Sequence, residues 1–137
     1  MPKTYRMSNT LRDAQKWREK KQTVYQKFEG KCAYCGIEID IETFQIDHLI
    51  SKHEGACLRQ KGIYINVENL SNLYPACFSC NNYKRAHSLE TFRSEISQQI
   101  RRLRRDQPTF RLAERYGLIS CNEDVTIQFF FEKEKYA

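Results

Sequence analysis

The first third of the chain carries the apolar spacing of a helix. From Thr10 to Phe28, apolar residues recur on one helical face, and Gly30 follows where such a helix would end. Thr10 and Asp13 have the form of a capping box. We therefore predict a helix over residues 10–28 with a polar, solvated outer face.

The C-terminal half shows two more helical patterns. Ser88 is a candidate N-cap, and the apolar residues between Leu89 and Leu103 fall on one stripe. Pro108 opens a shorter pattern that Gly117 ends. Additional helices are therefore expected after the middle of the chain.

Short strands are predicted between and after these helices. Residues 37–41 alternate apolar and acidic side chains, residues 44–46 and 72–77 have strand-like sequence, and residues 125–132 show the alternation of a half-buried strand. Residues 49–70 lack periodicity, so we expect a long irregular connection there, of the kind that is often functional.

Size and composition favour one domain over residues 1–137. The chain has 137 residues, and none of its apolar runs approaches the length of a membrane-spanning helix. Its first residues continue into polar sequence and not into a signal peptide, so we expect a soluble protein in the reducing cytoplasm, without a membrane partner. The net charge of +6 suits a polyanionic partner but does not by itself establish one.

The six cysteines change this picture. Four of them form two CxxC pairs, Cys32-Ala-Tyr-Cys35 and Cys77-Phe-Ser-Cys80. In a reducing compartment such pairs indicate metal and not disulfides, and two pairs complete the four-sulfur shell of structural zinc. Cys57 and Cys121 are interpreted as ordinary reduced thiols.

Between the two pairs lies an acid next to a histidine, Asp47-His48, followed by Asn72-Leu73; the second pair continues into Asn81 and, three residues on, Lys84. Over residues 32–84 this order resembles the HNH endonucleases of the ββα-metal class, of bacterial or phage type. The resemblance implies an α+β fold with a ββα-metal core held by a four-cysteine zinc site. To that core the periodicities above add an N-terminal helix, C-terminal helices and a C-terminal strand.

The resemblance also implies the chemistry. His48 would be the general base of a divalent-metal-dependent DNA endonuclease, and Asn72 would fix the histidine ring or the loop that carries it. Asp47 and Asn81 would hold one catalytic ion. Family members often have histidine at the position of Asn81, and the amide oxygen found here favours Mg²⁺ or Mn²⁺. The chain also lacks the proline that often follows the acid-histidine pair.

The implied partner is nucleic acid, most simply double-stranded DNA. Candidate contacts to nucleic acid are Lys52, His53, Lys84, Arg101 and Arg105. Lys84 is also a candidate helix cap. For the arginine run, however, a solvated helix face is the preferred interpretation, because charge runs on amphipathic helices are more often solvated than bound to phosphate. The competing hypothesis is a non-catalytic zinc module that binds nucleic acid or protein. RNA as substrate, the mode of cutting and the oligomeric state stay open.

Overall fold

The computed structural model describes residues 2–133, 135 and 136, and for residues 2–10 it describes the backbone alone. In chain order the elements are α1 (Pro2–Gln26), β1 (Gln45–His48), α2 (Lys52–Gln60), the 3₁₀ turn η1 (Leu70–Asn72), β2 (Leu73–Ala76), α3 (Phe78–Lys84), α4 (Leu89–Ser97), α5 (Gln99–Asp106), α6 (Pro108–Arg115) and the 3₁₀ turn η2 (Phe130–Glu132). The predicted α+β class is confirmed. Within the described residues, every helix is too short or too polar to span a lipid bilayer.

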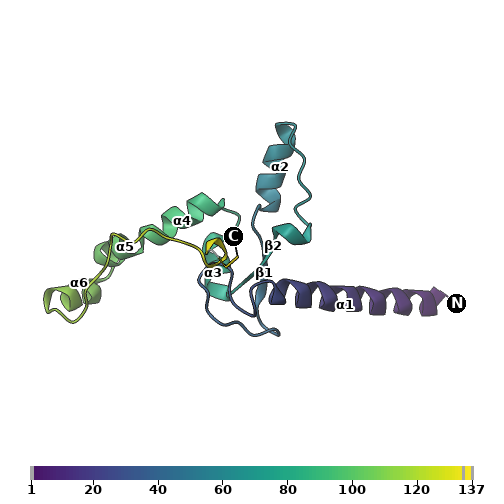
Figure 1. The fold of residues 1–137 in the computed structure, drawn as a ribbon, viewed down its shortest axis with the longest axis horizontal. Helices are drawn as coiled ribbons and strands as arrows, with labels where there is room; N and C mark the ends of the chain where they lie inside the picture. The colour runs from purple at the N-terminus through teal and green to yellow at the C-terminus, as the bar shows by residue number, and fades with distance from the viewer. Residues whose placement is uncertain (1, 134, 137) are drawn as a thin grey trace.

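A small hairpin lies at the centre of the molecule. β1 and β2 are antiparallel, with Gln45 opposite Ala76 and His48 opposite Leu73. α3 follows β2 after a single residue and contacts β1, which completes a ββα unit. Figure 1 shows three arms leaving this unit in different directions, namely α1, α2 with the chain that returns from it, and the α4–α6 segment.

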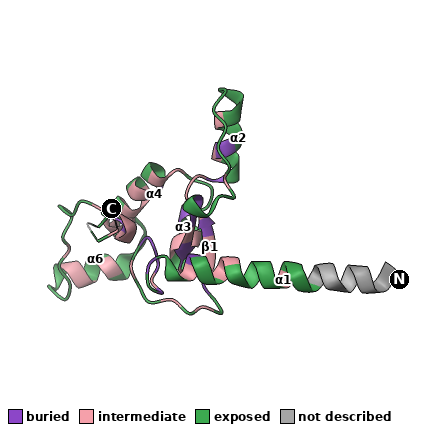
Figure 2. Ribbon diagram, turned by 45° about the vertical axis from the view of Figure 1, so that its right-hand side comes forward, coloured by how far each residue is buried: buried purple, intermediate pink, exposed green. Residues whose placement is uncertain are grey.

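Two apolar clusters hold the hairpin from its opposite faces, because successive side chains of a strand alternate between faces. Val24 of α1 packs with Phe44 and Leu73 on one face. The other cluster consists of Cys32, Tyr34, Ala76, Phe92 and Phe129. Figure 2 shows buried residues gathered around the hairpin and α3, whereas most of the described α1 arm is exposed. The ββα unit is therefore the fixed frame on which any site is built.

The first helix extends further than predicted. α1 begins at Pro2, so Thr10 lies inside the helix and is not its N-cap. A proline at the first helical position is compatible with this earlier start, since that position needs no backbone donor. The end is close to the prediction, because α1 stops at Gln26 and Gly30 adopts a positive φ of 74°.

The connection over residues 49–70 is not irregular, which corrects the prediction. It contains α2, whose N-cap Ser51 accepts a hydrogen bond from the backbone N–H of Glu54 at 3.0 Å. Ser-x-x-Glu is a helix-start signature, so the signal was present in the sequence. Gly55 lets the returning chain pass close to α2, because a Cβ at this position would lie 2.7 Å from Val67.

Two predicted strands are wrong. Residues 37–41 form only one isolated bridge, between Lys31 and Glu38. Residues 125–132 are extended and end in η2; they share only two backbone hydrogen bonds with the first cysteine turn, from Phe130 and Phe131 to the carbonyls of Tyr34 and Ala33. The apolar alternation in this tail is satisfied by packing instead.

The predicted helices after residue 88 are present. Ser88 accepts a hydrogen bond from the backbone N–H of Thr91 and caps α4. The single apolar stripe is divided at Gln98 into α4 and α5. α6 starts at Pro108, and Gly117 follows it with a positive φ of 70°.

Candidate metal centre and active site

The four paired cysteines meet at the base of α3. Cys32 and Cys35 lie in the turn after α1, and Cys77 is the N-cap of α3, one turn before Cys80. All four sulfur atoms lie within 4.8 Å of one another, and those of Cys35 and Cys77 are 3.8 Å apart. A tetrahedral ion with metal–sulfur distances of about 2.3 Å requires sulfur–sulfur edges of about 3.8 Å. The cluster therefore fits a structural zinc ion.

Glycine makes the first half of this cluster possible. Gly36 has a φ of 77°, and its N–H donates to the carbonyl of Cys32 at 2.9 Å, which closes the turn around Cys35. A Cβ on Gly36 would also lie 2.7 Å from the ring of Phe130. Both backbone conformation and space exclude a larger residue here.

The thiols perturb one another strongly. A hydrogen bond from Cys80 lowers the pKa of Cys32 to about 4, whereas burial raises the pKa of Cys35 to about 11. The pKa of Cys80 is raised by the same hydrogen bond to Cys32 and by burial. Protonated neighbours thus stabilise one thiolate, and a cation at the centre would let all four sulfurs ionise.

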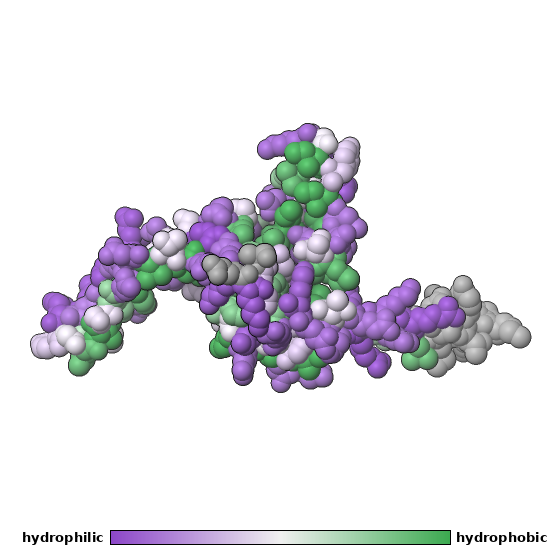
Figure 3. Space-filling model, in the orientation of Figure 1, coloured by the Kyte–Doolittle hydropathy of each residue, from purple (hydrophilic) through white to green (hydrophobic). Residues whose placement is uncertain are grey.

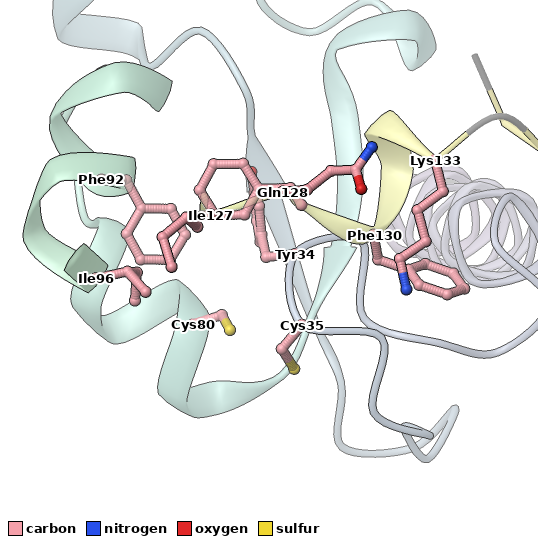
Figure 4. Close-up of a pocket in the computed structure, with 10 residues that line it drawn as sticks. Tyr34, Cys35, Cys80, Phe92, Ile96, Ile127, Gln128, Phe130 and Lys133 are labelled. Carbon is pink, nitrogen blue, oxygen red and sulfur yellow. The ribbon is translucent and has the colours of Figure 1, made fainter. Parts of the chain in front are cut away.

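An aromatic cavity of about 200 Å³ borders this cluster. Figure 4 shows Cys35 and Cys80 along one edge of the cavity, with Phe92 and Ile96 of α4 on one side and Phe130 on the other. Phe92 stacks on Phe129, with ring centroids 5.1 Å apart. The C-terminal tail therefore closes the apolar shell next to the sulfurs.

Asp47 belongs to β1, opposite Tyr74 of β2, and is buried. The hydroxyl of Tyr34 donates to its Oδ2 atom, and Nζ of Lys84 lies 3.0 Å from the same atom. Burial and the negative charge of Asp47 raise the pKa of Tyr34, so its hydroxyl stays a donor. One carboxylate oxygen is thus committed to two internal partners.

The position of Lys84 corrects the prediction that this lysine contacts nucleic acid. Its side chain is completely buried, and its ammonium donates to the backbone carbonyl of His48 at 2.9 Å as well as contacting Asp47. It is therefore not available to a substrate phosphate. Its contacts join the end of α3 to the two residues at the end of β1.

Asn81 lies on the same side of the hairpin as Asp47. Its Nδ2 atom donates to Oε1 of Gln45, two residues before Asp47 in β1, and residues two apart in a strand share a face. Because this hydrogen bond uses the amide nitrogen, the amide oxygen of Asn81 points away from Gln45. Gln45 was not predicted as a site residue, although its spacing from Asp47 was the available signal.

The ring of His48 leaves β1 on the opposite face, and a quarter of the side chain is exposed. Its Nε2 atom lies 3.0 Å from Oε1 of Glu68. The structure thus brings Asp47 and Asn81 to one face of the hairpin, whereas the ring of His48, the next residue in β1, leaves the strand on the other face.

Asn72 holds the loop after His48, and its side-chain hydrogen bonds among the described residues go to the backbone and not to the ring. Its Oδ1 atom accepts from the N–H of Ile50 at 2.8 Å, and its Nδ2 atom donates to the carbonyls of Ile50 and Val67. Its own carbonyl accepts from the N–H of Leu49. Asn72 therefore ties the chain on both sides of α2 together.

Glu68 is the residue that sequence reasoning missed. Besides His48, its carboxylate meets Nζ of Lys52 at 3.4 Å and Nζ of Lys20 at 3.6 Å. Partial burial works to raise its pKa, but the hydrogen bond with His48 and the charge of Lys52 lower it overall. The sequence offered no signal, because the three partners come from elements far apart along the chain.

The remaining candidates lie away from this centre. His53 is exposed on α2, with its Nε2 atom 3.8 Å from the sulfur of Cys57. Arg105 is exposed and pairs with the neighbouring Asp106, and Arg101 is exposed on α5. Two other arginines of this run, Arg102 and Arg104, are paired with acids. This pairing favours the solvated-face interpretation of α5.

Comparison with known proteins gives one match. Residues 32–87 match the family model described as HNH endonuclease, which covers the zinc cluster, the hairpin and α3. The predicted resemblance to HNH endonucleases is confirmed for these residues. No curated protein and no solved structure matches the chain. HNH domains are generally nucleases, so the domain indicates a nuclease-type function with a nucleic-acid substrate.

Proposed function

We propose that the HNH endonuclease domain formed by residues 32–87 is catalytically active and hydrolyses DNA phosphodiester bonds with a divalent metal ion. The observation that carries this proposal is the position of His48. Its imidazole is partly exposed at the end of a strand that the zinc cluster and Lys84 hold in place, directly after the buried carboxylate of Asp47. A binding module needs no exposed base at such a rigid point.

The oxygen atoms of Asp47 and Asn81 suit a hard ion. One carboxylate oxygen of Asp47 is engaged by Tyr34 and Lys84, which leaves Oδ1, and the oxygen of Asn81 is turned away from Gln45. Carboxylate and amide oxygens are the ligands that Mg²⁺ and Mn²⁺ prefer. When bound, such an ion would neutralise the charge that develops on the phosphate and the departing oxygen.

The chain's own residues have separate roles in this proposal. His48 accepts a proton from the attacking water, since a neutral imidazole is a competent base near pH 7. Lys84 fixes the backbone of His48 through its carbonyl, and Asn72 fixes the loop that follows. These contacts hold the base in place before the substrate arrives, which is the condition for efficient proton transfer.

The test uses two substitutions that act in different ways. Purified protein is incubated with supercoiled plasmid, with Mg²⁺, with Mn²⁺ or without added divalent metal. His48→Ala removes the base, so cleavage should fall by about 10²–10⁴-fold at every metal concentration. Asn81→Ala removes a metal ligand, so part of its lost activity should return as Mg²⁺ or Mn²⁺ is raised.

His53→Ala is the matched control, because it removes an exposed histidine from α2 that is not next to Asp47. All variants are checked for zinc content and folding. Wild-type cleavage by folded, zinc-loaded His48→Ala would exclude His48 as the base. A wild-type protein that binds DNA but never cuts it with any divalent ion would leave the binding-module hypothesis, and cutting confined to RNA would reassign the substrate.

A further inference from the structure

Three basic side chains from three separate elements converge on one carboxylate. Lys20 comes from α1, His48 from the end of β1 and Lys52 from the first residue of α2, and all three reach Glu68. Glu68 itself lies on the chain that returns from α2 towards η1. The tertiary fold thus brings these three basic side chains together as an anion-binding site, which the carboxylate of Glu68 occupies.

The contacts of Glu68 are exchangeable. The side chains of Lys20, Lys52 and Glu68 are 33%, 73% and 48% exposed. Exposed ion pairs contribute little to stability, because water and salt compete with them. A backbone phosphate oxygen offers lysine the same kind of anionic acceptor as a carboxylate oxygen, and a phosphodiester carries the same single negative charge. A nucleic-acid backbone that reached this point would therefore displace Glu68 at small cost.

The surroundings favour a polyanion. The described side chains of α1 include five basic residues on its approach to the hairpin, Arg12, Lys16, Arg18, Lys20 and Lys21, against the two acids Asp13 and Glu19. Figure 3 shows the described part of the α1 arm as largely hydrophilic. In Figure 1, α1 and α2 leave the hairpin in different directions, and Glu68 links the two helices through its contacts with Lys20 and Lys52.

From these observations we propose that Glu68 occupies the place of a substrate backbone phosphate, and that Lys20 and Lys52 bind this phosphate when nucleic acid displaces the carboxylate. The proposal rests on the nucleic-acid substrate of the proposed function and adds a specific binding subsite to it. Displacement of Glu68 also releases Nε2 of His48 from its 3.0 Å contact, so the base becomes free when the substrate is in place.

Competition between Glu68 and the phosphate should change the Kd for DNA in a way that a general charge effect would not. Glu68→Gln keeps the shape of the side chain but removes its charge, so the Kd for duplex DNA should fall by about two- to fivefold, the range of an exposed charge pair. Lys20→Ala and Lys52→Ala should each raise the Kd, and the variant that lacks both lysines, and with them the phosphate contact, should lower the magnitude of the log K against log salt slope by about 0.9.

The decisive measurement is the double-mutant cycle. If Glu68 competes for the two lysines, Glu68→Gln should change the Kd much less in the Lys20→Ala/Lys52→Ala background than in the wild type. A general charge effect would be additive in both backgrounds. Kd values are measured by fluorescence anisotropy with a labelled DNA duplex, at several salt concentrations and without added divalent metal, and a gel confirms that the duplex stays intact.

The chain offers matched controls for each charge. Lys21→Ala removes a lysine from another face of α1, where Nζ donates to the carbonyl of Glu42, and Glu42→Gln removes an exposed acid outside the cluster. Lys21→Ala should lower the magnitude of the salt slope less than the loss of Lys20 and Lys52 does, and neither control should alter the coupling in the cycle. Full additivity of Glu68→Gln with the lysine variants, or salt slopes equal to those of the controls, would refute the phosphate site.

A different result would assign Glu68 another role. If Glu68→Gln left the Kd unchanged but lowered kcat, Glu68 would position His48 instead, and the phosphate site would be wrong. Because the cycle measures binding alone, its outcome is independent of cleavage. A protein that shows the coupling but never cuts DNA would retain the phosphate site and lose the proposed nuclease activity.

Discussion

Lys84 and Asp47 form a buried ion pair, and Lys84→Met tests how much this pair contributes to the free energy of unfolding. The ammonium of Lys84 lies 3.0 Å from Oδ2 of Asp47 and donates to the carbonyl of His48 at 2.9 Å, with the lysine completely buried. Methionine keeps most of the apolar stem but removes the charge. Among the described side chains, Asp47 would then be a buried carboxylate whose one partner is the hydroxyl of Tyr34.

The expected loss is large, because the remaining charge has no counter-ion. Breaking a buried ion pair from one side costs about 3–5 kcal/mol, a substantial part of the roughly 5–15 kcal/mol of a typical domain. Urea unfolding of the zinc-loaded protein measures it. With a slope of about 1–3 kcal/mol per molar urea, the midpoint should fall by more than about 1 M.

Two further variants make the measurement specific. Lys16→Met removes an exposed lysine from α1 and should leave the free energy of unfolding within about 0.5 kcal/mol of wild type. Asp47→Asn combined with Lys84→Met replaces the ion pair with neutral groups, so it should recover most of the lost stability. The reasoning is refuted if Lys84→Met unfolds at the same urea concentration as Lys16→Met, or if the double variant is no more stable than the single one.

Two more predictions concern zinc and pH. Cys77→Ser should lose the bound zinc and unfold the ββα unit, because structural zinc contributes about 10–16 kcal/mol in model peptides. Metal analysis and circular dichroism measure the zinc content and the folding of the variant. Zinc retained by Cys77→Ser, or zinc lost from the control Cys57→Ser, would contradict the prediction. The hydrogen bond with Arg93 lowers the pKa of Glu132 below its ordinary 4.5. A lowered pKa means that this interaction stabilises the protein above pH 4.5 and that the stabilisation is lost as the pH falls through the folded pKa. Glu132→Gln should therefore be less stable than wild type at pH 7, and the two stabilities should become equal in acid. An equal stability difference at both pH values in thermal unfolding would exclude this role for the contact between α4 and the C-terminal tail.

Local signals in the sequence were sufficient for the metal centre and for several element ends. CxxC spacing brings two sulfurs together within one turn, so Cys32 with Cys35, and Cys77 with Cys80, could be recognised without knowledge of the fold. Ser88 as a cap of α4 is likewise a contact between neighbours in sequence. The same kind of signal existed at Ser51, where Ser-x-x-Glu marks the start of α2, but the weak periodicity after it concealed the helix.

Strand predictions failed where alternation was satisfied by other means. A strand exists only if another segment supplies hydrogen bonds along its length. Residues 45–48 and 73–76 find each other across a long insert, whereas residues 125–132 make two such bonds and then turn. Phe129 is nevertheless buried as the alternation predicted, because it stacks on Phe92.

The sequence by itself determined the chemistry that nearby residues can carry: four sulfurs in two turns, an acid beside a histidine, and an amide one helical turn after a cysteine. Only the tertiary structure decided what those groups meet. It buried Lys84 against Asp47 and placed Glu68 among Lys20, His48 and Lys52. The reason is physical, since the charge partners of a side chain depend on which distant elements pack beside it, and no local pattern in the chain records that packing.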